Sequence, residues 1–186
     1  MVKIIPKSTK LLEWLAARNS LIYRAISLYY KKLVKKEVAL ANIKSTDKVL
    51  CIGGGPCPFS GILLHEYTGA PVTIIDKDAR CVCVSRELIK KLGYDNAIKI
   101  ILSDGNDIAP KDFSVIHMAA QVSPLDKVFL HLKQGCCFGA RILVRLPKHR
   151  LSKFYSINEY SVFGNYYRKA VHKWRNVGST ALFIKS

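Results

Sequence analysis

The stretch CIGGGPCPFSGILLHE, residues 51–66, places three consecutive glycines and a Pro-Cys-Pro sequence directly after an apolar run. The run KVLCI (48–52) is typical of a buried strand, and SGILLHEYTG (60–69) is typical of a helix. Glycine lets the backbone adopt conformations closed to other residues and lets it approach a ligand closely. A glycine-rich turn between a strand and a helix therefore predicts a ligand-binding loop at the carboxyl end of the strand.

The residues around this loop exclude two common phosphate-binding loops. A P-loop needs Lys followed by Ser or Thr after its second glycine, and that pair is absent. A dinucleotide loop needs a third glycine three residues after its second, and counting from Gly53 and Gly55 this position is Pro58. Asp76 follows Gly55 at the distance where an acid accepts hydrogen bonds from ribose hydroxyls. We therefore expect a ligand that contains a ribose and no phosphate.

From residue 48 onward, short β-rich runs alternate with helical segments. The predicted strands are 48–52, 71–76, 98–102, 113–119 and 140–146, and the predicted helices are 60–69, 79–93 and 124–135. Near-continuous apolar strands indicate burial on both faces, which favours a parallel sheet covered by helices. The tail predicts an antiparallel hairpin from 166–175 and 179–185 around a turn at 176–178. The fold class is therefore α/β, a doubly wound Rossmann-like sheet of seven strands that ends in an antiparallel hairpin.

The N-terminal segment is predicted to be a helical extension covering residues 1–45, followed by the sheet domain over 46–186. Residues 8–43 contain neither Gly nor Pro, and their apolar spacing is helical at Ile22, Ile26, Tyr29 and Leu33. Ser8 or Thr9 is expected to cap the first turn, and Asn19-Ser20 to separate two helices. The opposite face carries Lys31, Lys32, Lys35 and Lys36. Such a helix either packs on its own domain or lies on a membrane or RNA.

The net charge of +17 is concentrated at the two ends of the chain. Residues 1–48 carry a net charge of +8, residues 49–140 are neutral, and residues 141–186 carry +9. Uncompensated positive charge attracts polyanions, so nucleic acid or an anionic membrane surface are candidate partners. The alternative is that the basic ends are solvated faces without a partner.

Cysteine spacing and hydropathy favour a cytoplasmic location. The six cysteines form no CxxC pair and no zinc-binding pattern with histidines, so no metal site is expected and the thiols are predicted to be reduced. Charged residues interrupt the apolar runs of the first 21 residues, and no later run reaches the roughly 18 apolar residues of a spanning helix. We expect a soluble protein without a transmembrane segment.

The segments KVLCIGGG, VTIIDKD and LSDGND, together with the final hairpin, resemble the class I S-adenosylmethionine-dependent methyltransferases over residues 46–186. The resemblance implies S-adenosyl-L-methionine as the cofactor. It implies that Gly53 and Gly55 lie next to the methionine moiety, that Asp76 binds the ribose hydroxyls, and that Asp104 and Gly105 lie beside the adenine. The neighbouring residues Gly54, Pro56 and Lys77 complete the predicted cofactor site.

The loop GGGPCPFSGI and the segment IIDKD resemble more closely the nicotianamine synthases, which transfer an aminobutyl group from S-adenosylmethionine. The likeness continues more faintly through residues 115–135 and the tail. This chain is shorter than those enzymes, and none of their acceptor-handling residues is matched here. The primary prediction is methyl transfer to an unidentified acceptor. The alternatives are aminobutyl transfer, or a non-catalytic basic scaffold that binds nucleic acid.

The acceptor is expected at the end of the fourth strand, because ligands of this fold lie at the carboxyl ends of strands. The segment HMAAQVSP (117–124) lacks the Asn-Pro-Pro-aromatic signature of base-amine methylation and a Pro-Cys pair for cytosine C5 chemistry. His117, Gln121 and Ser123 are the candidate pocket residues. His117 is a candidate base, although a histidine in an apolar strand is more often a core residue. No catalytic residue is assigned, because displacement at a sulfonium depends mainly on alignment.

Overall fold

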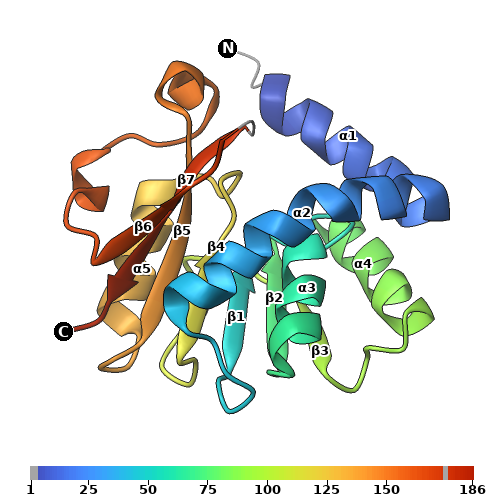
Figure 1. The fold of residues 1–186 in the computed structure, drawn as a ribbon, viewed down its shortest axis with the longest axis horizontal. Coiled ribbons are helices and arrows are strands. Elements are labelled where there is room, and N and C mark those ends of the chain that lie inside the picture. The colour runs from blue at the N-terminus through green and yellow to red at the C-terminus, as the bar shows by residue number, and fades with distance from the viewer. Residues whose placement is uncertain (1–3, 174–175) are drawn as a thin grey trace.

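The computed structural model describes residues 4–173 and 176–186, and its centre is a seven-stranded sheet (Figure 1). The strands are β1 (Val49–Ile52), β2 (Val72–Asp76), β3 (Ile98–Leu102), β4 (Val115–Met118), β5 (Arg141–Pro147), β6 (Arg168–Val171) and β7 (Val177–Ile184). Their order in the sheet is β3-β2-β1-β4-β5-β7-β6. The first five are parallel, and β7 pairs antiparallel with both β5 and β6. The predicted doubly wound sheet with a C-terminal hairpin is confirmed.

Helices cover both faces of the sheet (Figure 1). The helices α2 (Ser20–Ala41), α3 (Phe59–Thr68) and α4 (Ala79–Lys91) pack on one face, where buried side chains such as Leu33, Ile62 and Ile89 meet those of β1, β2 and β3. The helix α5 (Leu125–Gly135) packs on the other face through Phe129 and Leu132. Burial of the central strands β1, β4 and β5 from both sides explains their near-continuous apolar runs in the sequence.

The N-terminal segment forms two helices, α1 (Ile4–Arg18) and α2, separated at Asn19 as predicted. The Asn19 side chain accepts hydrogen bonds from the backbone N–H groups of Leu21 and Ile22, which caps α2. The predicted cap at Ser8 or Thr9 is wrong, because α1 is already helical at Ile4. The first turn of α1 contains Pro6, which has no backbone N–H and is tolerated at a helix start.

Two short 3₁₀ helices, η1 (His149–Phe154) and η2 (Ser161–Phe163), connect β5 to β6 and were not predicted. Phe163 of η2 is buried against Phe129 and Phe183. The hairpin strand predicted to run to residue 175 is shorter, since β6 ends at Val171, and residues 174–175 lie outside the described residues. No described helix is long and apolar enough to cross a membrane.

Candidate functional site

A cavity of about 750 Å³ opens at the carboxyl ends of β1, β2 and β4. The strand order reverses between β1 and β4, and this switch point leaves a crevice above the sheet. Ten of the eleven predicted site residues line the cavity: Gly53, Gly54, Gly55, Asp76, Lys77, Asp104, Gly105, His117, Gln121 and Ser123. Pro56 is buried and does not line it. The fold therefore brings residues that are far apart in the sequence to one cavity.

The glycine loop after β1 is packed tightly against β2. Gly53 and Gly55 have backbone φ angles of +83° and +66°, which residues other than glycine rarely adopt. A Cβ atom on Gly54 would lie 2.5 Å from Cγ2 of Ile74, which is too close for any real side chain. The backbone N–H groups of Gly53 and Gly54 both donate to the carbonyl oxygen of Ile75. Each of the three glycines is thus required by conformation or by space.

Asp76 ties this loop to the end of β2. Its Oδ2 accepts a 2.7 Å hydrogen bond from the Gly55 backbone N–H, and its Oδ1 accepts a 2.9 Å bond from the Asp78 N–H. A carboxylate oxygen can accept more than one hydrogen bond, so Asp76 keeps capacity for a ligand donor on the cavity side. Asp76 is therefore both a lining residue and the residue that holds the loop in place.

Lys77 spans the cavity edge between the ends of three strands. Its Nζ donates to the Ser123 carbonyl oxygen at 3.0 Å and lies 3.7 Å from Oδ2 of Asp104. The Asn106 backbone N–H, the Asn106 side-chain amide and Lys77 together lower the pKa of Asp104, against the opposite effect of partial burial. Gly105 follows at a position where a Cβ atom would lie 2.7 Å from Val128, so the chain here packs directly on α5. The Asp104 carboxylate is therefore ionised at this corner of the cavity.

Glu13 of α1 is a site residue that the sequence analysis missed. It is 9% exposed, it lines the cavity, and its Oε2 lies 2.7 Å from the place that a Cβ atom on Gly55 would occupy. Its Oε1 accepts a 3.1 Å hydrogen bond from the Tyr30 hydroxyl, and burial followed by Glu13 raises the pKa of Tyr30. The one available signal was that Glu13 is the only acidic residue among the first 36.

A buried ionic network lies between α2 and the sheet and extends to the cavity. Arg145 donates from Nε and Nη2 to the two carboxylate oxygens of Glu37, both at 2.8 Å, and from Nη1 to the Ser60 hydroxyl at 2.8 Å. Thr180 also donates to Glu37, at 2.6 Å. Burial alone would raise the pKa of Glu37, but Arg145 and His117 hold it well below its ordinary value. The network is ionised and joins α2 to β4, β5 and β7.

His117 belongs to this network and is 1% exposed. Its Nε2 lies 3.3 Å from Oε2 of Glu37. Burial and then the neighbouring Arg145 lower the pKa of His117, although Glu37 acts in the opposite direction. A buried neutral imidazole beside an ion pair acts mainly as part of the core, which is the more common situation for a histidine in an apolar strand. Gln121 and Ser123 are the more exposed of the three candidate acceptor residues.

Cys57, in the loop, is buried, and burial and then Glu13 raise the pKa of its thiol. A thiol with a raised pKa carries little thiolate at neutral pH and is a poor nucleophile. Cys57 also lines the cavity, so it can contact a ligand there as a small apolar residue.

Comparison with solved structures establishes the fold class. A mutant of MtNAS, a nicotianamine synthase, is similar over 95% of this chain and 71% of that chain, with a TM-score of 0.79 and 26% identity. The same mutant in complex with S-adenosylmethionine gives a TM-score of 0.80 at 25% identity, over 95% of this chain and 73% of that chain. The RNA methyltransferase from Salinibacter ruber, in complex with S-adenosyl-L-homocysteine, gives 0.65 at 14% identity over 83% and 90% of the two chains.

The chain has the class I methyltransferase fold. Its glycine loop is similar to that of the nicotianamine synthases, as the sequence predicted. No family model matches the chain. Among curated proteins, the L-histidine 2-aminobutanoyltransferase of Yersinia pestis is 28% identical over 72 residues, which are 39% of this chain. The match spans only 27% of that relative's length.

Proposed function

We propose that this protein is a transferase that uses S-adenosyl-L-methionine. The observation that carries the proposal is the Gly53–Gly55 loop tied to Asp76, with Asp104 across the same cavity. The residues fit the cofactor, because the side-chain-free loop allows close approach and the two carboxylates offer acceptors for hydroxyl and amine groups. Solved relatives of this fold contain S-adenosylmethionine or S-adenosyl-L-homocysteine.

Bound S-adenosylmethionine would supply a sulfonium, which activates its attached carbons toward displacement by a nucleophile. In this proposal the glycine loop binds the methionine portion, Asp76 orients the ribose, and Asp104 with Gly105 borders the adenine. Phe59, Tyr30 and residues of α1 and α2 line the cavity, and the Tyr30 ring stacks on Phe59. Alignment of donor and acceptor is the main contribution required of the protein.

Glu13 is proposed to position the acceptor. Its carboxylate is held by Tyr30 beside the loop where the sulfonium would lie, and a buried negative charge favours a cationic or proton-bearing partner. An acceptor amine would find at Glu13 a hydrogen-bond acceptor and a place for its proton. Gln121 and Ser123 are proposed to line the acceptor side, with His117 beneath them as a buried support.

The transferred group is a methyl or an aminobutyl group, and the cavity itself is compatible with both. Methyl transfer is the reaction of the methyltransferases that share this fold. Aminobutyl transfer is favoured by the higher similarity to MtNAS, which was also solved in complex with MTA and tNA, and by the aminobutanoyltransferase match. We rank aminobutyl transfer first on these comparisons and keep methyl transfer as the second candidate.

Product analysis separates the two reactions. The protein is incubated with S-adenosylmethionine and a panel of small amines and nucleic acids, and the nucleosides are resolved by chromatography. Aminobutyl transfer releases methylthioadenosine, and methyl transfer releases S-adenosylhomocysteine. Binding of S-adenosylmethionine without either product would favour a non-catalytic scaffold, and absence of binding would reject the proposal as a whole.

Three further assignments are also proposals. The basic ends are proposed to bind a polyanion, supported by their net charges of +8 and +9. A cytoplasmic location is proposed because all six cysteines are free thiols, as suits a reducing compartment. The division into an extension of residues 1–45 and a domain of residues 46–186 is kept, with α2 packed on α3 and on the sheet through Glu37.

A further inference from the structure

The strand β6 forms one edge of the sheet and carries exposed cations. Among the described residues it pairs only with β7. Arg168 lies opposite Leu182, which belongs to the core on one face of the sheet. Lys169 lies opposite Ala181, which belongs to the core on the other face. Successive strand residues point to opposite faces, so this edge has a cation on each side. Both cations are exposed.

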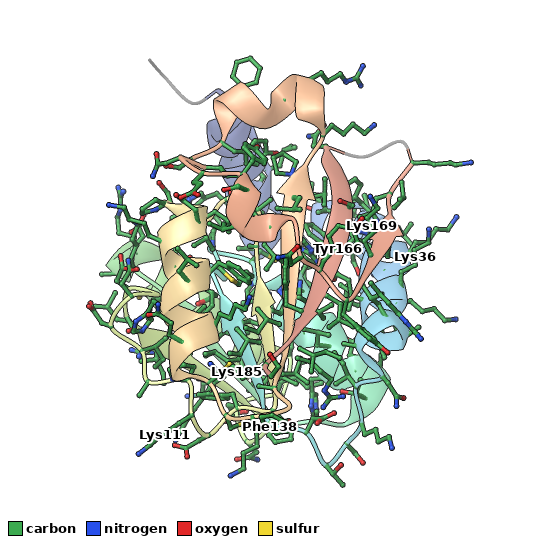
Figure 2. The ribbon with its side chains drawn as sticks, turned by 90° about the vertical axis from the view of Figure 1, so that its left-hand side faces the viewer. Lys36, Lys111, Phe138, Tyr166, Lys169 and Lys185 are labelled. Carbon is green, nitrogen blue, oxygen red and sulfur yellow. The ribbon has the colours of Figure 1, made fainter. Side chains whose placement is uncertain are left out.

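Two exposed tyrosines lie against these cations. The Lys169 ammonium is 5.0 Å from the centre of the Tyr166 ring, and the Arg168 guanidinium is 5.2 Å from that of Tyr167. Tyr166 is 38% exposed and Tyr167 is 61% exposed. Figure 2 shows Tyr166, Lys169 and Lys36 on the same side of the molecule. The Lys36 ammonium donates to the Val171 carbonyl oxygen at 3.3 Å, which places a third cation on the strand edge.

A shallow groove of about 570 Å³ adjoins the tyrosines. It is lined by Asn165, Tyr166, Tyr167, Ile184 and Ser186. None of these residues lines the large cavity, so the groove is separate from the proposed cofactor site. It offers aromatic faces together with an amide side chain that can both donate and accept hydrogen bonds.

Acidic side chains are missing from this part of the chain. Residues 160–186 contain no Asp or Glu, and the one acid of α2, Glu37, is fully buried in its pair with Arg145. The exposed cations of the edge are therefore uncompensated by acids of these two segments. We define Asn165, Tyr166, Tyr167, Arg168, Lys169 and Lys36 as the β6 edge surface.

We propose that the β6 edge surface binds single-stranded RNA. Unpaired bases stack on Tyr166 and Tyr167, as they do on exposed aromatic rings in general, and the adjacent phosphates pair with Arg168, Lys169 and Lys36. Ribose 2′-hydroxyls can both donate and accept hydrogen bonds, which suits the backbone groups of an edge strand and distinguishes RNA from DNA. A second copy of the chain is a poorer partner, because edge-to-edge pairing would bring like charges together.

The proposal is tested by fluorescence anisotropy with a labelled twelve-nucleotide oligouridylate over about 50–200 mM salt. Tyr166→Ala/Tyr167→Ala should weaken binding by about tenfold or more with an unchanged salt slope, because stacking is worth about 1–3 kcal/mol per base. Arg168→Gln/Lys169→Gln should reduce the log-log salt slope by about 1.4, because each phosphate contact on a single strand contributes about 0.7.

Matched controls lie elsewhere on the surface. Phe138→Ala removes an aromatic ring that is 85% exposed and lies away from Tyr166 (Figure 2), and Lys90→Gln/Lys91→Gln removes two exposed cations from α4. Both should bind the oligouridylate as wild type does. All variants should retain wild-type thermal unfolding and S-adenosylmethionine binding, so failure of this proposal is distinguishable from failure of the proposed transferase function.

Several outcomes would overturn the proposal. Unchanged binding by the tyrosine variant means that charge alone attracts the oligonucleotide, and equal affinity for the corresponding DNA or for duplex RNA rejects a single-stranded RNA site. Loss of self-association in the edge variants, measured by sedimentation, would identify the surface as an interface between copies. Their loss of binding to anionic lipid vesicles, without loss of RNA binding, would assign it to a membrane.

Discussion

The backbone N–H of Gly55 and Oδ2 of Asp76 are joined by a 2.7 Å hydrogen bond, although the two residues are 21 positions apart in the sequence. The bond connects the end of β2 to the loop after β1. It gives Asp76 a structural role in the cavity, because the same carboxylate orders the loop and faces the proposed ribose position.

Replacing Asp76 is expected to weaken cofactor binding. In Asp76→Ala the affinity for S-adenosylmethionine should fall by about tenfold or more, since a hydrogen bond to a charged group is worth about 1.5–3 kcal/mol. Isothermal titration calorimetry measures the change, and Asp95→Ala, which removes an exposed acid, serves as the control. Equal affinity of wild type and Asp76→Ala would remove Asp76 from the cofactor site.

Glu13 is expected to affect turnover more than cofactor binding. Glu13→Gln keeps the shape of the side chain and its contact with Tyr30 but removes the negative charge. The rate of product formation should fall by on the order of 10²-fold, the range of general acid–base contributions, while the dissociation constant for S-adenosylmethionine changes little. The matched control is Glu66→Gln, because Glu66 also accepts a hydrogen bond from a tyrosine, Tyr94, but lies outside the cavity. A wild-type rate in Glu13→Gln would argue against its proposed role.

Arg145 is expected to be essential for stability. Arg145→Met leaves the Glu37 carboxylate buried without its main partner, which should lower the free energy of unfolding by about 3–5 kcal/mol. Arg80→Met breaks an exposed pair with Asp78, for which about 0–1 kcal/mol is expected. Urea unfolding followed by circular dichroism compares the two. Similar small losses in both variants would show that the buried network contributes little.

The lowered pKa of His117 is expected to make the stability of the protein depend on pH. Its pKa is lower in the folded protein than the ordinary 6.5, so below pH 6.5 the unfolded chain binds a proton that the folded chain does not. The free energy of unfolding should therefore be fully retained above about pH 7 and should fall as the pH drops below 6.5. In His117→Gln this decline should be smaller. Parallel pH profiles for wild type and variant, from chemical denaturation, test the prediction, and identical profiles would contradict it.

The sequence alone determined the order of the elements and the position of the glycine loop. Buried parallel strands require apolar runs, and tight strand-to-helix turns require glycine, so both features are visible locally in residues 48–146. The carboxyl ends of parallel strands meet at one edge of the sheet, which is why the order of strands along the chain suffices to assign Asp76, Asp104 and His117 to one site.

The tertiary structure alone decided which residues complete the site and hold the N-terminal helices. Glu13 reaches Gly55 only because α1 and α2 pack back over the loop, and Glu37 meets Arg145 across 108 positions of sequence. Local patterns carry no information on such contacts, because a lone acid in an amphipathic helix looks the same whether it is solvated or buried. Because α2 packs on the sheet, the Glu37 carboxylate is buried away from solvent and pairs with Arg145. The same packing brings Glu13 to the cavity.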